Sequence, residues 1–470
     1  MTAREIAVLI TVGAAMAAAG CGKTQEQAPV DKRRADADRE VRARYGKGLD
    51  ELPTVKLVAI SPNNTDIERE YEDAFSLHHA VQFGQQVDID WRDVGGGSSA
   101  ILRYLENVYS TSDRSGIDVV WGGGEDNFVR LCADGILHKM TIPADVLDNV
   151  PAMLGGVKLY DGEHRWCGSA VSGFGFLYNK PLLERLGRQL PALWEDLGDG
   201  RFYDLVGLAD PTQSGSAANN YEMIVQSGKE WPAGWAKLLS ILGNAKKFYA
   251  GAGDAADAVP SGEVAVAACI DFYGTIRVSK YPDTLVYVSP KGQTTFTPDP
   301  IAILKNPPSP ELAQRFVDFV LSLEGQAMWA LPAGSPGGPV RSQLGRQPIR
   351  KDVYEKYAGR LPPAIVNPYT AGQGMQVDVQ LWSASFDVLK QLVGAAAVRN
   401  RNGLRAAKKT LIDTGFEPQR LAEFIALPEN VSSRNKLDEV ARQLRDDKQA
   451  EIVTSGWVEF FRQKYERVSK

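Results

Sequence analysis

The sequence has few of the residues that usually hold structural metals. Its 470 residues include only four cysteines, none of them paired at zinc-site spacing, and four histidines that form no metal-binding motif. We therefore expect no structural zinc. Of the cysteines after Cys21, two could form a disulfide in an oxidising compartment, or all three could remain thiols, and the sequence leaves both open for Cys132, Cys167 and Cys269.

The signals of nucleic-acid binding and of several enzyme classes are also missing. The net charge of -5 is mild for this length and no basic stripe occurs, so nucleic acid is not an expected partner. The loop 95–99 lacks the lysine of a nucleotide-binding loop, the glycines 122–124 lack dinucleotide spacing, and Ser216 lacks the second glycine of a nucleophile elbow. We expect no enzyme, and an enzyme that uses carboxylates remains a remote alternative.

The N-terminal apolar segment is too short to span a membrane. It covers residues 6–19, whereas a spanning helix needs about 20 residues. Arg4 precedes the segment, and Gly20-Cys21 follows it. This pattern predicts a lipoprotein signal peptide over residues 1–20 and a lipid on Cys21. Residues 21–53 are charged and poor in large apolar side chains, which predicts a flexible tether. We expect an extracytoplasmic, periplasmic protein that a lipid anchors to the membrane.

Three strand–loop–helix units follow the tether. Their strands are expected at 55–60, 87–91 and 117–121, and alternating strands and helices predict a parallel α/β sheet with helices on both faces. Proteins with such sheets bind their ligands beyond the carboxyl ends of the strands. The backbone amides in the first turn of each following helix can bind an anion there. The three loops therefore offer candidate ligand-binding residues, unless their glycines only permit tight turns: Asn63, Asn64, Gly96, Ser98, Ser99, Gly123, Gly124 and Glu125.

A fourth loop of this kind occurs in the middle of the chain. The short strand 205–209 leads into Asp210-Pro211, and Ser214-Gly215-Ser216 then precedes a helix from about 217 to 226. Ser214 and Ser216 can offer hydroxyl groups, and the amides from Gly215 onward can donate to the same anion. Plain N-capping of the helix is the alternative role of the two serines.

Three motifs, in this order, resemble those of type II extracellular solute-binding proteins of ATP-binding-cassette importers. They are Asp90–Gly96, Asp118–Gly124 and Asp210–Ser216, and the resemblance is nearest to family 1, the ferric-iron-binding-like branch. The likeness covers residues 55–349. It implies a two-lobed periplasmic-binding-protein-like type II fold that closes on a ligand in the cleft between its lobes. It also implies lobe 1 at 54–172 and 300–375, lobe 2 at 173–299, and delivery of the ligand to an ABC permease.

The resemblance leaves the ligand open. Iron-binding relatives use two adjacent tyrosines as phenolate ligands, but Phe272 stands where the first would be and the early loop has no histidine. Tyr273 is then the candidate metal ligand. The metal would be ferric iron, bound as the transported ligand, and we expect no permanently bound cofactor. An organic anion or amine is the alternative. For a cation, the expected partners are Asp271, Asp299, Glu125 and Asp126, with Trp121 and Tyr273 as stacking faces.

The last part of the chain exceeds this likeness. Residues 376–470 are charged and carry apolar stripes at helical spacing, which predicts a helical C-terminal extension. The extension could pack on the first lobe, contact the permease or pair with a second copy of the chain, and the sequence is compatible with all three. From these patterns we expect the solute receptor of an importer. The alternative is the ligand-binding component of a sensor, because such a protein would have the same fold and the same ligand cleft.

Overall fold

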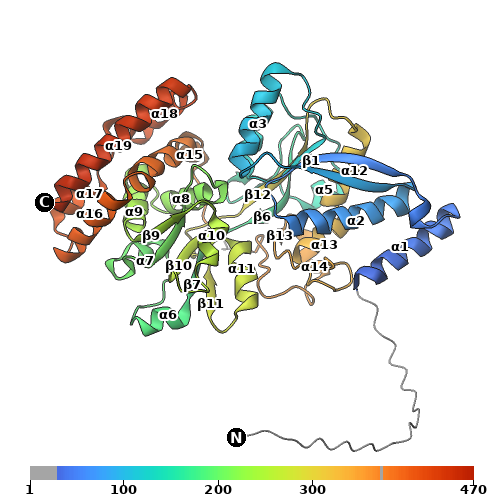
Figure 1. The fold of residues 1–470 in the computed structure, drawn as a ribbon, viewed down its shortest axis with the longest axis horizontal. Helices are drawn as coiled ribbons and strands as arrows, with labels where there is room; N and C mark the ends of the chain where they lie inside the picture. The colour runs from blue at the N-terminus through green and yellow to red at the C-terminus, as the bar shows by residue number, and fades with distance from the viewer. Residues whose placement is uncertain (1–28, 371–373) are drawn as a thin grey trace, which may run out of the picture.

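The computed structural model describes residues 29–370 and 374–470. Two α/β lobes, each built on a mixed sheet, are joined by crossing segments, and the C-terminal helices cover the second lobe (Figure 1). The expected signal peptide and the lipidation site Cys21 lie outside the described residues. Within the described ranges, no helix is long and apolar enough to cross a membrane.

Lobe 1 is built on a six-stranded sheet of order β13-β6-β12-β3-β1-β2. β1 pairs in parallel with β2 and β3, as expected from the three strand–loop–helix units. β12 is antiparallel to both β3 and β6, so the sheet is mixed. Its strands are β1 Thr54–Ile60, β2 Gln86–Arg92, β3 Val119–Trp121, β6 Cys167–Ser172, β12 Thr297–Ile303 and β13 Gln347–Pro348.

Helices cover both faces of this sheet. Alternate residues of β3 point to opposite faces, so that Trp121 packs with Tyr71 and Phe316 on one face while Val120 packs with Phe128 on the other. A short hairpin is formed by β4 Met153–Leu154 and β5 Val157–Lys158. The helices are α2 Thr65–Phe83, α3 Ser98–Thr111, α4 Glu125–Ala133, α5 Ala144–Asn149, α12 Pro310–Leu321, α13 Leu323–Ala330 and α14 Lys351–Lys356.

Lobe 2 is built on a five-stranded sheet of order β11-β7-β10-β8-β9. The chain enters it at Gly173, between β6 and β7, and returns to the first sheet at Thr297. The strands are β7 Phe174–Asn179, β8 Val206–Ala209, β9 Ala245–Tyr249, β10 Val266–Ile270 and β11 Leu285–Val288. The helices are α6 Lys180–Arg185, α7 Trp194–Gly198, α8 Gly215–Gln226, α9 Trp231–Gly243, α10 Ala252–Asp257 and α11 Asp271–Lys280.

The prediction of a flexible tether over residues 21–53 is wrong from residue 29 onward. Residues Pro29–Tyr45 form helix α1, which packs along α2 (Figure 1). Val41 of α1 and the nearby Leu49 are buried against Ala80 and Val81 of α2. The charged composition concealed this helix because only a few apolar side chains are needed to cover a narrow stripe.

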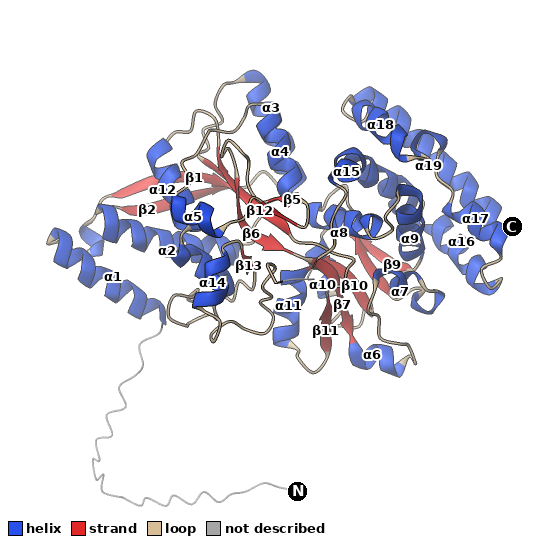
Figure 2. Cartoon of the chain, turned by 180° about the vertical axis from the view of Figure 1, so that it is seen from behind, coloured by secondary structure: helices blue, strands red, loops and turns tan. Residues whose placement is uncertain are grey.

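The C-terminal extension packs mainly on lobe 2 and also contacts lobe 1 through Trp382. Its helices share one apolar core with α9, where Trp235 lies next to Phe461 of the last helix with ring centres 5.9 Å apart. Figure 2 shows this layer on the side of lobe 2 that faces away from lobe 1. The helices are α15 Val379–Val393, α16 Arg401–Asp413, α17 Pro418–Ile425, α18 Leu437–Gln443 and α19 Asp447–Ser469. Cys132, Cys167 and Cys269 are all thiols, with no disulfide among them.

Candidate ligand-binding site

A cavity of about 400 Å³ lies between the two lobes. Its lobe 1 wall comes from the loops that follow β1, β2 and β3, as the rule for carboxyl ends of strands predicts. Its lobe 2 wall comes from the loops before α8 and α10 and from the start of α11. Of the residues predicted from the sequence, the wall includes Asn63, Asn64, Gly96, Ser98, Gly123, Gly124, Ser214, Gly215, Ser216, Tyr273 and Asp299.

The N-termini of α3 and α8 meet across this cavity. α3 begins at Ser98 and has no side-chain cap, whereas the Ser214 hydroxyl accepts a hydrogen bond from the Ala217 amide at 3.3 Å at the start of α8. A Cβ atom placed on Gly215 would lie 2.6 Å from Oγ of Ser98, so the lobes are in direct contact here. The structure is therefore a closed arrangement, with two helix N-termini and their unpaired amides facing one space.

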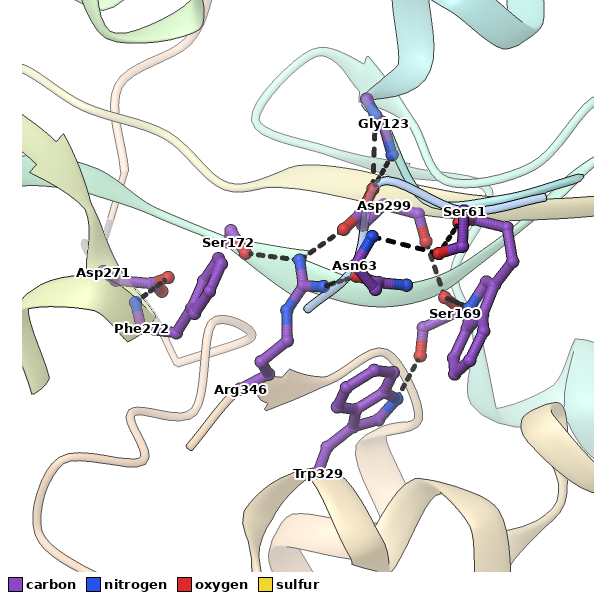
Figure 3. A network of polar contacts seen from close by, with 12 residues as sticks. Ser61, Asn63, Gly123, Ser169, Ser172, Asp271, Phe272, Asp299, Trp329 and Arg346 are labelled. Atoms are coloured by element: carbon purple, nitrogen blue, oxygen red, sulfur yellow. Dashed lines mark hydrogen bonds and ion pairs between the residues drawn. The ribbon is translucent and has the colours of Figure 1, made fainter. Parts of the chain in front are cut away.

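Arg346 lies at the floor of the cavity and was not predicted from the sequence. Its Nη2 donates to Asp299 Oδ2 at 2.5 Å and to Ser172 Oγ at 3.2 Å, and its Nη1 donates to Asn63 Oδ1 at 3.2 Å (Figure 3). The guanidinium carbon lies 4.6 Å from the centre of the Phe272 ring. The side chain is only 2% exposed. Arg346 is therefore held in one position by contacts on several sides.

Asp299 uses both of its carboxylate oxygens inside the protein. Oδ1 accepts the Gly123 amide at 2.6 Å and the Gly124 amide at 3.2 Å, while Oδ2 accepts from Arg346. The glycine loop after β3 therefore binds a carboxylate of the chain itself. By contrast, Nε of Arg346 and Nδ2 of Asn63 are buried with no hydrogen-bond partner among the described residues. These two donors lie within the hydrogen-bond network around Arg346.

Five predicted residues do not lie on the cavity wall: Ser99, Glu125, Asp126, Asp271 and Trp121. The Asp271 carboxylate accepts the Gly173 amide at 2.9 Å and its neighbour's amide, so it fixes the point where the chain enters lobe 2. Burial raises the pKa of Asp271 to about 6. Ser99 is buried in the first turn of α3. Glu125 lies behind the glycine loop, where burial raises its pKa to about 8.

Tyr273 lies on the wall, but its surroundings do not favour a phenolate. Burial raises the pKa of its hydroxyl, an effect that the positive charges of Arg346 and Arg277 only partly offset. Its ring packs beside Phe272 with centres 4.4 Å apart. Across the described residues, no group of three or more histidine, cysteine, aspartate or glutamate side chains is arranged to hold a metal ion. Trp121, predicted as a stacking face, is buried and donates to Ser169 instead.

The comparison with protein families agrees with this fold and cleft. Residues 117–352, half of the chain, match the model of the bacterial extracellular solute-binding proteins, and the chain belongs to this family. It is thus an extracellular or periplasmic solute-binding protein and not an enzyme.

Two curated relatives resemble part of the chain. The phosphoglycerate transport regulatory protein PgtC of Salmonella typhimurium is 30% identical over 161 residues, which cover 34% of this chain and 40% of PgtC. A second protein from the same organism, named "Putative 2-aminoethylphosphonate-binding periplasmic protein", is 27% identical over 36% of this chain and 50% of its own length. The chain therefore spans half or less of the curated relatives that it matches.

Solved structures resemble the chain over most of both lobes. Iron-bound HitA from Pseudomonas aeruginosa aligns with a TM-score of 0.55 and 21% identity, and covers 72% of this chain and 99% of HitA. The periplasmic binding protein AfuA from Actinobacillus pleuropneumoniae, with fructose-6-phosphate bound, aligns with a TM-score of 0.53 and 18% identity, over 68% of this chain and 92% of AfuA. At these identities the likeness shows the fold alone.

Proposed function

We propose that this protein is a lipid-anchored receptor that binds a small organic phosphate or phosphonate between its lobes and delivers it to an ABC permease. The observation that carries this proposal is that the N-termini of α3 and α8 and the buried Arg346 line one cavity. Ser98 and Gly215 bring two helix N-termini together, and Arg346 lies on the wall of the same cavity. Several oxygen atoms on one phosphorus centre would use such a set of converging donors.

The ligand is expected to carry an organic part as well as the anionic group. A cavity of about 400 Å³ exceeds the space that a single phosphate group needs, and it is lined partly by Ile67, Phe174 and Ile270. The exposed carboxylate of Asp254 also lies on the wall and would suit a hydroxyl or an amine of the ligand. The names of the two curated relatives, which refer to phosphoglycerate and 2-aminoethylphosphonate, support this ligand class.

Ferric iron fits the cavity less well. Iron in proteins of this fold needs several hard anionic oxygen donors. Of the predicted set, Asp271 binds backbone amides at the lobe crossing, and Asp299 is committed to Arg346 and the glycine loop. Tyr273 alone remains, with a pKa that burial raises. We therefore place the organic anion ahead of iron as the transported ligand.

The lipid anchor and the lobe limits also belong to this proposal. Cys21 follows the small residues of a lipoprotein signal, and we propose that its acyl chains attach the protein to the membrane. The lobe limits predicted from the sequence, 54–172 and 300–375 for lobe 1 and 173–299 for lobe 2, are proposed with one change: the return to lobe 1 is placed at Thr297, where β12 begins. Growth with a labelled fatty acid should label the wild-type chain and leave Cys21→Ser unlabelled. Equal labelling of both would contradict the anchor.

A ligand-binding component of a sensor is the second candidate function. The observation that favours it is the name of one curated relative, a transport regulatory protein. Both functions use the same cleft, so ligand binding does not separate them. Cross-linking of the closed receptor in membranes does: capture of a permease supports the importer, and capture of a membrane kinase supports the sensor.

A thermal-shift screen tests the ligand class. The chain starting at Gly22 is heated with phosphate, 2-aminoethylphosphonate, 3-phosphoglycerate, thiamine, polyamines or ferric citrate, since a compound that binds only the folded state raises the melting temperature. We expect a shift with one of the organic phosphorus compounds. A shift with ferric citrate and a coloured complex would restore iron as the ligand and contradict the proposal.

A further inference from the structure

The C-terminal extension is attached to both lobes. Residues 374–378 run from lobe 1 to α15, beside the strand that returns from lobe 2. The Met375 amide donates to the Thr294 carbonyl at 2.7 Å, and the Val377 amide donates to the β4–β5 hairpin of lobe 1 at 3.0 Å. At Asp378 the chain reaches lobe 2, where the Asp378 amide donates to a glutamine of α8 at 2.9 Å. This segment is a third connection between the lobes, besides the two at the sheets.

Trp382 of α15 lies at the boundary between the lobes. Its indole Nε1 donates to Oδ2 of Asp126, on α4 of lobe 1, at 3.4 Å. The ring is 8% exposed and belongs to one apolar cluster with Phe174, Ile270 and Phe272. These three residues also line the ligand cavity. One tryptophan of the extension therefore contacts lobe 1 and packs in the cluster that forms the wall of the site.

Carboxyl groups surround this contact. Burial raises the pKa of Asp126 to about 6, and its neighbour Asp387 adds to the effect. Glu222 of α8 is fully buried, accepts from the Ser385 hydroxyl of α15 at 3.0 Å, and has a pKa that burial raises to about 8. The other charged groups facing the contact are Glu125 and Lys158 of lobe 1, the ion pair of Glu106 with Arg130, and Asp387 and Lys390 of α15.

We propose that α15 is a latch between the lobes, in which Trp382 engages Asp126 only in the closed form and thereby sets the ratio of closed to open receptor. Hinge opening moves α4 of lobe 1 away from lobe 2 and from the extension packed on it, which separates the two residues. Trp382 is thus a positioning residue for the cavity wall, and it acts through the cluster that includes Phe272. The latch depends on the two-lobed fold and not on which ligand binds.

The latch also links closure to protons. Closing the lobes buries Asp126, which favours the protonated carboxyl over the charged one. The closed form therefore binds more protons than the open form, and its population falls as the pH rises through the raised pKa of Asp126. Asparagine at this position keeps an oxygen acceptor for the indole and removes the titration.

Distance measurement between the lobes, without ligand, tests the latch. Spin labels are placed on the exposed Arg103 of α3 and Glu184 of α6, in the chain from Gly22 with Cys132→Ser, and distances are measured by pulsed electron resonance from pH 5 to 9. We expect the closed population to fall with rising pH. Trp382→Phe should lower the closed-to-open ratio about two- to tenfold, the effect of losing one hydrogen bond. A ratio unchanged in Trp382→Phe and flat with pH would overturn the proposal.

Two further variants distinguish an effect on lobe closure from an effect on the stability of the fold. Trp457→Phe removes a matched indole bond, to Asn430 at 3.0 Å, that lies wholly inside the extension. It should leave the closed-to-open ratio unchanged even if it lowers the melting temperature. Asp126→Asn should reduce the dependence of the ratio on pH between 5 and 7, and it tests the latch from lobe 1 if Trp382→Phe weakens the fold of the extension. Equal distance distributions in Trp457→Phe and Trp382→Phe would assign Trp382 a structural role only.

Discussion

Arg346 and Asp299 form a buried ion pair at the floor of the cleft, with Nη2 and Oδ2 2.5 Å apart. Asp299 lies on β12, and Arg346 immediately precedes the short strand β13. Because Asp299 also accepts the amides of Gly123 and Gly124, the pair joins three segments of lobe 1 that are distant in sequence. The arginine is thereby fixed on the cavity wall, with Asp299 as its ion-pair partner.

Arg346→Lys should weaken ligand binding more than it weakens the fold. An ammonium group can replace the ion pair with Asp299 but not the planar set of donors to Asn63 and Ser172. We expect at least about a tenfold loss of affinity for the phosphorus compound found in the thermal screen, since one or more charge-assisted hydrogen bonds are lost. Calorimetric titration measures it. Unchanged affinity would remove Arg346 from the site.

Arg346→Met should destabilise the protein, because it leaves Asp299 charged without its partner. Removal of one member of a buried pair costs about 3–5 kcal/mol. The double variant with Asp299→Asn removes both charges and should recover part of this loss. Urea denaturation of the two variants and the wild type gives the free energies of unfolding. Equal stability of the single and double variants would show that the pair is not coupled.

Gly215→Ala should weaken closure of the cleft. The added Cβ would lie 2.6 Å from Oγ of Ser98 in the closed form, closer than real Cβ contacts, so the Ser98 hydroxyl must rotate away before the lobes can close. Affinity should fall while the melting temperature of the empty protein stays nearly constant. Gly97→Ala is the matched control at the same joint, because its Cβ would lie at an ordinary 3.6 Å from the Gln213 carbonyl. Equal loss of affinity in both variants would contradict steric block at Gly215.

Glu222→Gln should change how stability depends on pH. Burial raises the pKa of Glu222 from 4.5 to about 8, so the folded state binds the proton more tightly than the unfolded state. The stability that this proton provides is complete below pH 4.5 and is lost as the pH rises to 8. Glutamine resembles the neutral form, so the variant should be more stable than the wild type at pH 9. Denaturation at pH 5, 7 and 9 tests this, with the exposed Glu451→Gln as control. Parallel curves for wild type and Glu222→Gln would contradict it.

The three strand–loop–helix units could be predicted from the sequence because their signals are local. Buried strands, glycine loops and caps lie next to one another along the chain, and the loops at Asn63, Gly96 and Gly123 follow directly. The antiparallel β12 could not be assigned its place between β3 and β6, because its partners are distant in sequence. Helix α1 was missed for a different reason, since its few apolar residues gain their burial from α2.

The loops of the site could be predicted from the sequence, but the positions of its charged side chains could not. Serine and glycine residues at helix N-termini carry a local pattern, whereas Arg346 stands in a segment without periodicity and meets Asp299 47 residues away. Asp271 was misplaced because it directly precedes Phe272 and Tyr273, the positions at which iron-binding relatives carry their two tyrosine ligands. In the structure that carboxylate turns to the amide of Gly173 at the crossing between lobes. Such choices depend on tertiary contacts that one sequence does not show.

The most direct test of the proposed function compares 3-phosphoglycerate with glycerate, and 2-aminoethylphosphonate with ethylamine, by calorimetric titration of the chain from Gly22. Each pair differs by the phosphorus group that the N-termini of α3 and α8 and Arg346 are proposed to hold. The account predicts that at least one phosphorus compound binds and that its partner without phosphorus binds at least about a hundredfold more weakly, because the buried donors would be left unpaired. Equal affinity within the pair, or tight binding of ferric citrate alone, would contradict it.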